Sequence, residues 1–317
     1  MIAIFAPGQG AQTPGMLAPW LELTGVADTV GEWSELAGLD LVRLGTTADA
    51  DEIKDTAVTQ PLIVALGAIV AAQVGADDQT AGEPERVVAG HSVGELTAAS
   101  VAGALSPADA IAFAARRGGE MAAACAVTPT GMSALLGGDP DEVVAVIEAV
   151  GLTPANRNGA GQIVAAGAVD ALEKLAAEPP AGARVRPLPV AGAFHTHYMA
   201  PAEHALRDYA ADLEPSDPRP ILLSNADGAA VTSGRELINR LVAQVTLPVR
   251  WDLCLQTCAD LGVTAAIELA PAGALTGIAK RELPGVELLA IKSPDDLDHA
   301  RTLIASGPHH RESEHTS

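Results

Sequence analysis

The segment 90–94, which reads Gly-His-Ser-Val-Gly, holds the residues best suited to chemistry in this chain. It follows a short apolar run, 86–89, and precedes a segment expected to be helical from Glu95. Glycines on both sides of Ser92 permit the sharp strand-to-helix turn of a nucleophile elbow, which holds a serine hydroxyl away from the backbone. The amides that begin the helix would face any anion formed there. The alternative interpretation is a tight turn with an incidental serine.

A serine of ordinary acidity needs a base, and histidine is the natural candidate. The chain has eight histidines, three of them in its polar C-terminal tail. His91 adjoins Ser92 in sequence, but neighbours on a sharp turn point apart. His195 follows a predicted strand, at the expected seam between two subdomains, where clefts form. We therefore expect His195 to be the base, with a structural histidine bonded to the backbone as the alternative.

A glycine-flanked glutamine and a pair of arginines could complete the site. Gln9, between Gly8 and Gly10, follows the first predicted strand, and its main-chain amide could form a two-donor oxyanion hole with the amide of Val93. By itself this loop matches neither the phosphate-binding nor the dinucleotide spacing, and an ordinary turn is the alternative. Arg116 and Arg117 stand in an alanine-rich helix. One is expected in solvent, while the other could turn into the cleft and pair with a carboxylate.

The elements that must position these residues alternate between strand and helix, which predicts an α/β fold with a mainly parallel sheet. Residues 132–190 instead read as β-α-β-β-α-β, the ferredoxin-like order. We therefore expect a large hydrolase-like α/β domain with an inserted ferredoxin-like α+β subdomain. The expected boundaries are 1–127 and 196–305 for the large domain, 128–195 for the insert and 306–317 for a disordered tail.

Composition excludes several classes of protein. Acidic residues outnumber basic ones 40 to 19, for a net charge of −21, which argues against nucleic acid as a partner. Three cysteines cannot build a full disulfide framework, as fits a reducing compartment. The N-terminus lacks a basic segment, and the longest apolar stretch, 61–74, is shorter than the roughly 20 residues that span a bilayer. We expect a soluble cytoplasmic protein without a membrane partner.

Taken together, the motifs resemble those of the malonyl-CoA:acyl-carrier-protein transacylases, the stand-alone acyltransferases of bacterial type II fatty-acid or polyketide synthesis. The resemblance covers about residues 1–292 and rests on motifs in the family's order: Gly8–Gln12, Gly90–Glu95, Arg117–Gly118, Asn156–Asn158 with Gln162, Ala193–Thr196 and Pro248–Trp251. Agreement of several motifs is more specific than any one of them.

The resemblance implies a role for each matching residue. Ser92 would carry the malonyl group as an ester. His195 would act as base and then as acid, oriented by a main-chain carbonyl that the motif 248–251 assigns to Arg250. The amides of Gln9 and Val93 would form the oxyanion hole.

The same resemblance implies the substrate and the partners. Arg117 would bind the malonyl carboxylate, and Phe194 in the histidine motif favours malonyl over branched methylmalonyl. The partners would be malonyl-CoA and an acyl carrier protein. No metal or cofactor of its own is expected, because CoA arrives as substrate and phosphopantetheine on the carrier. We expect a monomer.

Docking of an acidic carrier to this acidic chain would need a local basic patch. The candidates are Arg184, Arg186, Lys280 and Arg281. Two other functions stay open at this point: a serine thioesterase with water as acceptor, and a catalytically silent carrier-docking protein. Free CoA released without carrier would indicate the first, and a serine that never becomes malonylated would indicate the second.

Overall fold

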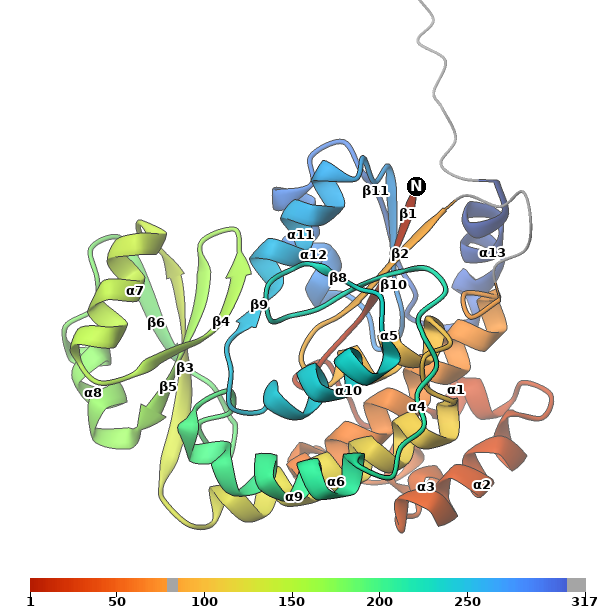
Figure 1. Cartoon of the computed structure of the whole chain (residues 1–317), viewed down its shortest axis with the longest axis horizontal. Coiled ribbons are helices and arrows are strands. Elements are labelled where there is room, and N and C mark those ends of the chain that lie inside the picture. Colours follow the sequence, from red (N-terminus) through yellow and green to blue (C-terminus); the bar gives the residue numbers. More distant parts are fainter. Residues whose placement is uncertain (79–84, 307–317) are drawn as a thin grey trace, which may run out of the picture.

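The computed structural model describes residues 1–78 and 85–306. Its two sheets form separate groups of strands, one in each lobe of the molecule (Figure 1). The tail expected to be disordered lies outside the described residues, except for residue 306. That residue ends the last helix, so the prediction is wrong there.

The larger sheet has six strands in the order β11-β10-β1-β2-β7-β8. All neighbours are parallel except the pair β7–β8, which confirms the predicted α/β class. Every residue of β1 and β2 is buried, as expected for parallel strands covered on both faces. The strands are β1 (Ile2–Ala6), β2 (Arg86–Gly90), β7 (Ile221–Leu223), β8 (Ala230–Val231), β10 (Ala265–Glu268) and β11 (Glu287–Ala290).

Helices cover both faces of this sheet, because side chains of a strand alternate between the faces. Ile2 and Ile4 of β1 belong to a core shared with the helices α1 (Ala18–Leu21), α2 (Val26–Ala37), α3 (Leu41–Thr46), α4 (Thr56–Val74), α5 (Gly94–Val101), α6 (Pro107–Cys125), α9 (Ala200–Ala210), α10 (Gly234–Ala243) and α13 (Leu297–Ser306). Ala3 and Phe5 belong to a second core with α11 (Trp251–Asp260) and α12 (Ala274–Glu282). Short 3-10 helices are η1 (Glu52–Lys54), η2 (His197–Met199) and η3 (Pro294–Asp296).

Helix α4 is longer than the apolar stretch 61–74 that lies within it. It runs from Thr56 to Val74, so residues 56–60 also belong to the helix and Pro61 lies in its interior. Among the described residues this is the one helix long and apolar enough to cross a membrane by length and composition. However, 78% of its most apolar 18-residue window is buried inside the protein, as in the core helix of a globular domain.

The smaller sheet has the predicted ferredoxin-like order of elements. Its first four strands pair antiparallel in the order β6-β3-β5-β4. They are β3 (Thr130–Gly137), β4 (Thr153–Gly159), β5 (Gln162–Ala168) and β6 (Ala183–Pro187), connected in part by α7 (Pro140–Ala149) and α8 (Val169–Ala177). The two helices share an apolar core with this sheet.

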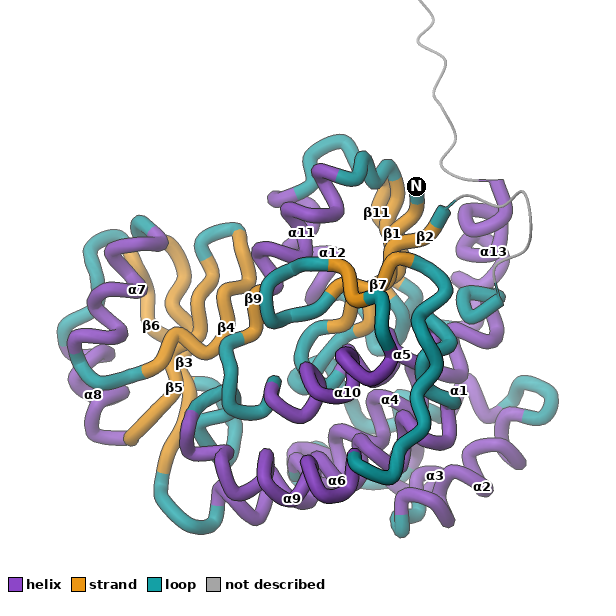
Figure 2. Tube along the Cα trace, in the orientation of Figure 1, coloured by secondary structure: helices purple, strands orange, loops and turns teal. Residues whose placement is uncertain are grey.

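A fifth strand joins the small sheet from outside the predicted insert. β9 (Val249–Arg250) pairs in parallel with β4, placing Val249 opposite Asn156. The expected boundaries place residues 249–250 in the large domain. The sequence predicts no strand there, because two residues are too short to show the alternation typical of a strand. β9 therefore ties the two lobes together, and Figure 2 shows it beside β4, between the two groups of strands.

Candidate active site

Ser92 lies on a sharp turn between the end of β2 and the start of α5. Its φ of 53° is left-handed, a conformation that non-glycine residues adopt rarely and that nucleophile elbows impose. The flanking glycines are required by space. A Cβ on Gly90 would lie 2.0 Å from the Gly94 carbonyl, and one on Gly94 would lie 2.2 Å from the Ala6 oxygen. The predicted turn is present.

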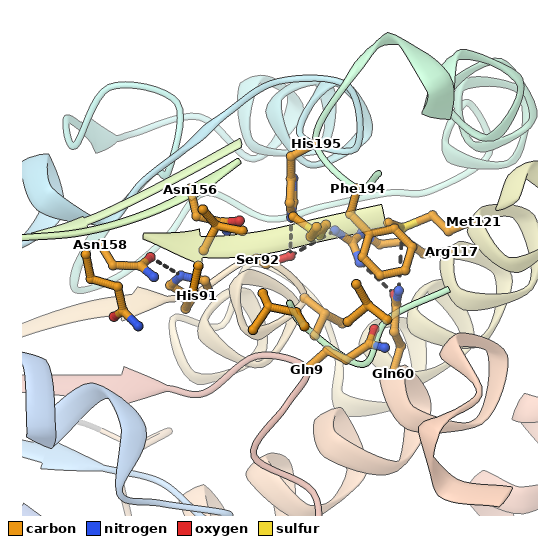
Figure 3. A pocket seen from close by; sticks show the side chains of 17 residues that line it. Gln9, Gln60, His91, Ser92, Arg117, Met121, Asn156, Asn158, Phe194 and His195 are labelled. Atoms are coloured by element: carbon orange, nitrogen blue, oxygen red, sulfur yellow. Dashed lines mark hydrogen bonds between the residues drawn. The ribbon is translucent and has the colours of Figure 1, made fainter. Parts of the chain in front are cut away.

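His195 contacts the Ser92 hydroxyl directly. The distance from Ser92 Oγ to His195 Nε2 is 2.7 Å, and Figure 3 shows this contact. His195 Nδ1 lies 2.8 Å from the carbonyl oxygen of Gln244. Because a carbonyl only accepts, Nδ1 carries the hydrogen and Nε2 is left to accept the serine proton. The neighbouring His91 instead lies with Nε2 2.8 Å from Asn158 Oδ1.

The expected role of Arg250 in orienting His195 is wrong. The carbonyl that accepts from the imidazole belongs to Gln244, which follows α10. Arg250 ends β9 and immediately precedes α11; it donates its amide to the Asn225 carbonyl oxygen at 2.8 Å and pairs its guanidinium with Asp252. Every residue carries a main-chain carbonyl, so its type does not reveal which one faces an imidazole.

Burial keeps the His195 imidazole neutral. The residue is 3% exposed, and burial together with the nearby Arg117 cation lowers the pKa of His195 to about 3, against the opposing effect of the Gln244 carbonyl. An imidazole that is unprotonated at neutral pH is ready to accept a proton.

Arg117, and not Arg116, turns into the site. Arg116 pairs with Glu120 at 3.0 Å on the surface, whereas Arg117 is 2% exposed. Its guanidinium donates to Gln60 Oε1 at 2.6 Å, to Gln244 Oε1 at 2.8 Å and to Ser92 Oγ at 3.3 Å. Burial lowers the pKa of Arg117 to about 10, opposed by Glu95, so the side chain stays protonated at neutral pH.

Arg117 makes no direct ion pair with any carboxylate of the described ranges. Its partners are two neutral amides and a hydroxyl. A buried cation with unused donors beside a nucleophile is suited to a small anion, which a guanidinium can bind through two parallel hydrogen bonds.

These groups share one cavity of about 190 Å³ between the two lobes. Figure 3 shows Ser92, His195 and Arg117 at its centre and Gln9 on one wall. Residues of β3, β4 and β5 form the opposite wall, so the cavity depends on both sheets. Two further hollows also include Gln9. One of about 360 Å³ extends past Lys54, and one of about 440 Å³ extends past His91 to Arg281.

The two proposed oxyanion donors line this cavity. Gln9 and Val93 follow the carboxyl ends of the adjacent parallel strands β1 and β2. Within residues 1–78 and 85–306, neither main-chain amide donates to another protein atom. Both amides are therefore available to a ligand, as an oxyanion hole requires.

The site also contains four polar residues that the sequence analysis did not predict as functional: Gln60, Glu95, Asn225 and Gln244. All are at most 5% exposed. A local signal exists for Gln60 and Glu95, which are polar residues within the apolar helices α4 and α5. Asn225 follows β7, whose carboxyl end lies at the same sheet edge as Ser92. Gln244 has no local signal.

The four candidate docking residues do not form one patch. Lys280 and Arg281 are exposed in the last turn of α12, which packs against β4, and Arg281 lines the hollow beyond His91. Arg184 and Arg186 lie on β6, the opposite edge of the small sheet. In the described part of the chain, no group of three or more His, Cys, Asp or Glu side chains could hold a metal ion.

The chain is similar to known acyltransferases over nearly its whole length. The family profile of the acyl transferase domain matches residues 4–292. The malonyl CoA-acyl carrier protein transacylase of Mycobacterium tuberculosis is 57% identical over 303 residues, covering 96% of this chain and 100% of that protein. The protein of that name in Escherichia coli K12 is 32% identical over 308 residues, covering 95% and 99%.

Solved structures show the same similarity in three dimensions. A crystal structure of MCAT from Mycobacterium tuberculosis superposes with a TM-score of 0.92 at 57% identity, covering 95% of this chain and 99% of that one. A malonyl-transacylase in complex with its type II polyketide acyl-carrier protein superposes with a TM-score of 0.87 at 29% identity, covering 94% and 98%.

Proposed function

The chain belongs to the acyl transferase domain family, and we propose that it transfers a malonyl group from malonyl-CoA to the phosphopantetheine thiol of an acyl carrier protein. The transfer supplies extender units for fatty-acid or polyketide synthesis. It passes through a malonyl ester of Ser92, so that CoA leaves before the carrier thiol reacts.

The first half-reaction acylates the serine. Ser92 Oγ attacks the thioester carbonyl while His195 Nε2, 2.7 Å away, takes the hydroxyl proton. The carbonyl oxygen becomes an oxyanion, which accepts hydrogen bonds from the amides of Gln9 and Val93. Collapse of this intermediate breaks the carbon–sulfur bond, and the leaving CoA sulfur receives the proton from His195.

The second half-reaction reverses these roles with a different thiol. His195 takes the proton of the phosphopantetheine thiol, the sulfur attacks the ester carbonyl, and Ser92 leaves with that proton. Loss of one oxyanion donor raises such a barrier by roughly 3–4 kcal/mol. The two main-chain amides therefore matter as much as the base.

The observation that carries the proposal is the position of Arg117. A buried cation whose partners are neutral lies 3.3 Å from the nucleophile, where it can bind the carboxylate of a short diacid attached to Ser92. An acetyl group would leave that cation unpaired, and a site built for a polar group rejects substrates that lack it. Phe194 lines the same cavity and favours the unbranched malonyl group over methylmalonyl.

The same observation weighs against the two other functions. A general thioesterase has no need of a buried guanidinium beside its serine. A silent docking protein has no need of a serine, an imidazole and an oriented carbonyl within hydrogen-bond distance of one another.

For location and assembly, we infer a monomer that acts in the cytoplasm, away from membranes and nucleic acid. The net charge of −21 supports this inference, since it disfavours binding to phosphate-rich surfaces. The carrier would dock at Lys280 and Arg281 in the last turn of α12, where Arg281 lines the hollow that leads past His91.

Mass spectrometry of the intact protein after mixing with malonyl-CoA tests the proposal. We expect the mass of one malonyl group on wild type, its absence from Ser92→Ala, and its loss when carrier protein with a phosphopantetheine arm is added. Rapid release of free CoA in excess of protein, without carrier, would identify a hydrolase. A wild-type protein that never gains the group would refute catalysis.

A further inference from the structure

Beside the catalytic serine, the side chains of Glu95, Gln244 and Asn225 form a buried polar cluster to which the transfer steps assign no role. Asn225 Oδ1 accepts the Ser92 amide at 2.8 Å, and its Nδ2 donates to the Gly90 carbonyl at 2.8 Å. The Glu95 carboxylate accepts the Asn225 main-chain amide through one oxygen and Gln244 Nε2 through the other. The cluster therefore supports both ends of the serine turn.

The side chain of Gln244 connects this cluster to the guanidinium. Its Oε1 accepts from Arg117 at 2.8 Å, and its Nε2 donates to the Ser92 carbonyl at 3.1 Å as well as to Glu95. The main-chain carbonyl of the same residue accepts from His195. One residue thus touches the nucleophile turn, the base and the cation.

The orientation of the Gln244 amide is functionally important because its two ends are chemically different. Arg117 only donates, so it must face the amide oxygen, and the nitrogen must then face acceptors. Glu95 suits this place as a carboxylate, since both of its oxygens face donors. A neutral amide or a protonated acid at this position would direct a donor of its own at one of these two donors, and this would disfavour the observed orientation of the Gln244 amide.

On the basis of the proposed function, we propose that Glu95 is a positioning residue for malonyl transfer. It holds the Gln244 amide with its oxygen toward Arg117 and its nitrogen toward the serine turn. Through that amide it keeps the malonyl carboxylate site in register with Ser92. It touches neither substrate nor the reacting atoms.

The charges around Glu95 make this role sensitive to pH. Burial raises the pKa of Glu95 to about 7, against the Asn225 amide, the Gln244 amide and the Arg117 and Arg240 cations, which lower it. The buried Cys254 thiol also faces it. Protonation near neutrality would replace one acceptor with a donor. His195 does not titrate in this range, since its pKa is lowered to about 3.

The first experiment uses wild type. The rate of Ser92 acylation is measured with malonyl-CoA and acetyl-CoA between about pH 8 and pH 6. The phosphates of CoA titrate in both substrates and cancel in the ratio of the two rates. We expect the malonyl-to-acetyl ratio to fall with falling pH, because the contacts of Arg117 with Ser92 and His195 act on both substrates and cancel in the ratio, whereas its contact with the carboxylate acts on malonyl alone. A ratio independent of pH would overturn the proposal, whereas absence of malonyl-serine would refute the transfer function itself.

The second experiment uses Glu95→Gln, which keeps size and burial but removes the charge. We expect the malonyl-to-acetyl ratio to fall by about 10-fold to 10²-fold, the range in which small misplacements of binding groups act, and its dependence on pH near 7 to disappear. A variant that folds and keeps the wild-type ratio and pH profile would overturn the proposal. The wild-type experiment decides the matter if this variant does not fold.

Glu268→Gln is the matched control. Glu268 is completely buried and accepts the amides of Leu275 and Thr276 at 3.0 and 2.8 Å, at the start of α12, and neither partner belongs to the cluster of Glu95, Gln244 and Asn225. We expect this variant to lower the thermal midpoint while keeping the wild-type ratio and pH profile. An equal loss of selectivity in this control would assign the effect to general destabilisation and overturn the proposal.

Discussion

Replacing Arg117 with alanine should abolish selection for the carboxylate while leaving the chemistry of the serine and histidine in place. A guanidinium can give a carboxylate two charge-assisted hydrogen bonds, each worth about 1.5–3 kcal/mol. Loss of about 3–6 kcal/mol corresponds to a fall of about 10² to 10⁴ in the malonyl-to-acetyl ratio of acylation rates. Acetyl transfer should be unchanged or faster, because acetyl leaves the buried cation unpaired in wild type.

Two variants sharpen the measurement. Arg117→Lys keeps the charge but cannot reach Gln60 and Gln244 at once with a planar fork, so we expect an intermediate ratio. Arg116→Ala is the matched control, since this neighbour pairs with Glu120 on the surface. Single-turnover acylation, stopped by acid and read by intact mass, gives both rates. A ratio in Arg117→Ala within about twofold of wild type would refute the assignment of the carboxylate site.

Three further predictions concern stability and docking. Between about pH 6.5 and pH 3 the unfolded chain binds a proton at His195 that the folded protein excludes. The free energy of unfolding, measured by urea titration, should therefore decrease as the pH is lowered through this range, and it should decrease less steeply in His195→Gln. Parallel curves for wild type and variant would contradict this. Gly94→Ala places a Cβ 2.2 Å from a carbonyl oxygen and should lower the thermal midpoint and prevent acylation. Gly119→Ala, with open space around its Cβ, should do neither, and equal effects would refute the steric argument. Reversing the charges of Lys280 and Arg281 should raise the KM for carrier protein and reduce its salt dependence; an unchanged KM would exclude this docking surface.

The residues that share one cavity could be identified from the sequence where local backbone chemistry limits the choice. The glycines around Ser92 indicate a sharp strand-to-helix turn. His195 lies where the ferredoxin-like order of elements ends and the α/β alternation resumes, which places it at the boundary between the two subdomains. The residue types alone left the choice between Arg116 and Arg117 open, and only the resemblance of Arg117–Gly118 to a family motif favoured Arg117. One helical position separates the two arginines, and the packing of α6 against α4 decides which one is buried.

The remaining parts of the site depend on tertiary structure alone. The acceptor for His195 is a main-chain carbonyl of Gln244, not of Arg250, and the type of a residue leaves no mark on its carbonyl. Asn225 follows β7, more than a hundred residues after Ser92 in the chain, and contacts it only in the folded protein. β9 was missed because two residues cannot show a strand period, so its pairing with β4 is visible only in the folded chain.

The pairing of β9 with β4 also affects how the ester is protected from water. The short connection from Gln244 to β9 joins the carbonyl that orients the imidazole to the sheet that forms the far wall of the cavity. A hinge motion that swung this wall outward would pull on that connection and misalign His195 as solvent entered. In such an open molecule the misaligned imidazole would be a poor base for water, so the same connection that aligns His195 for transfer would disfavour hydrolysis of the ester.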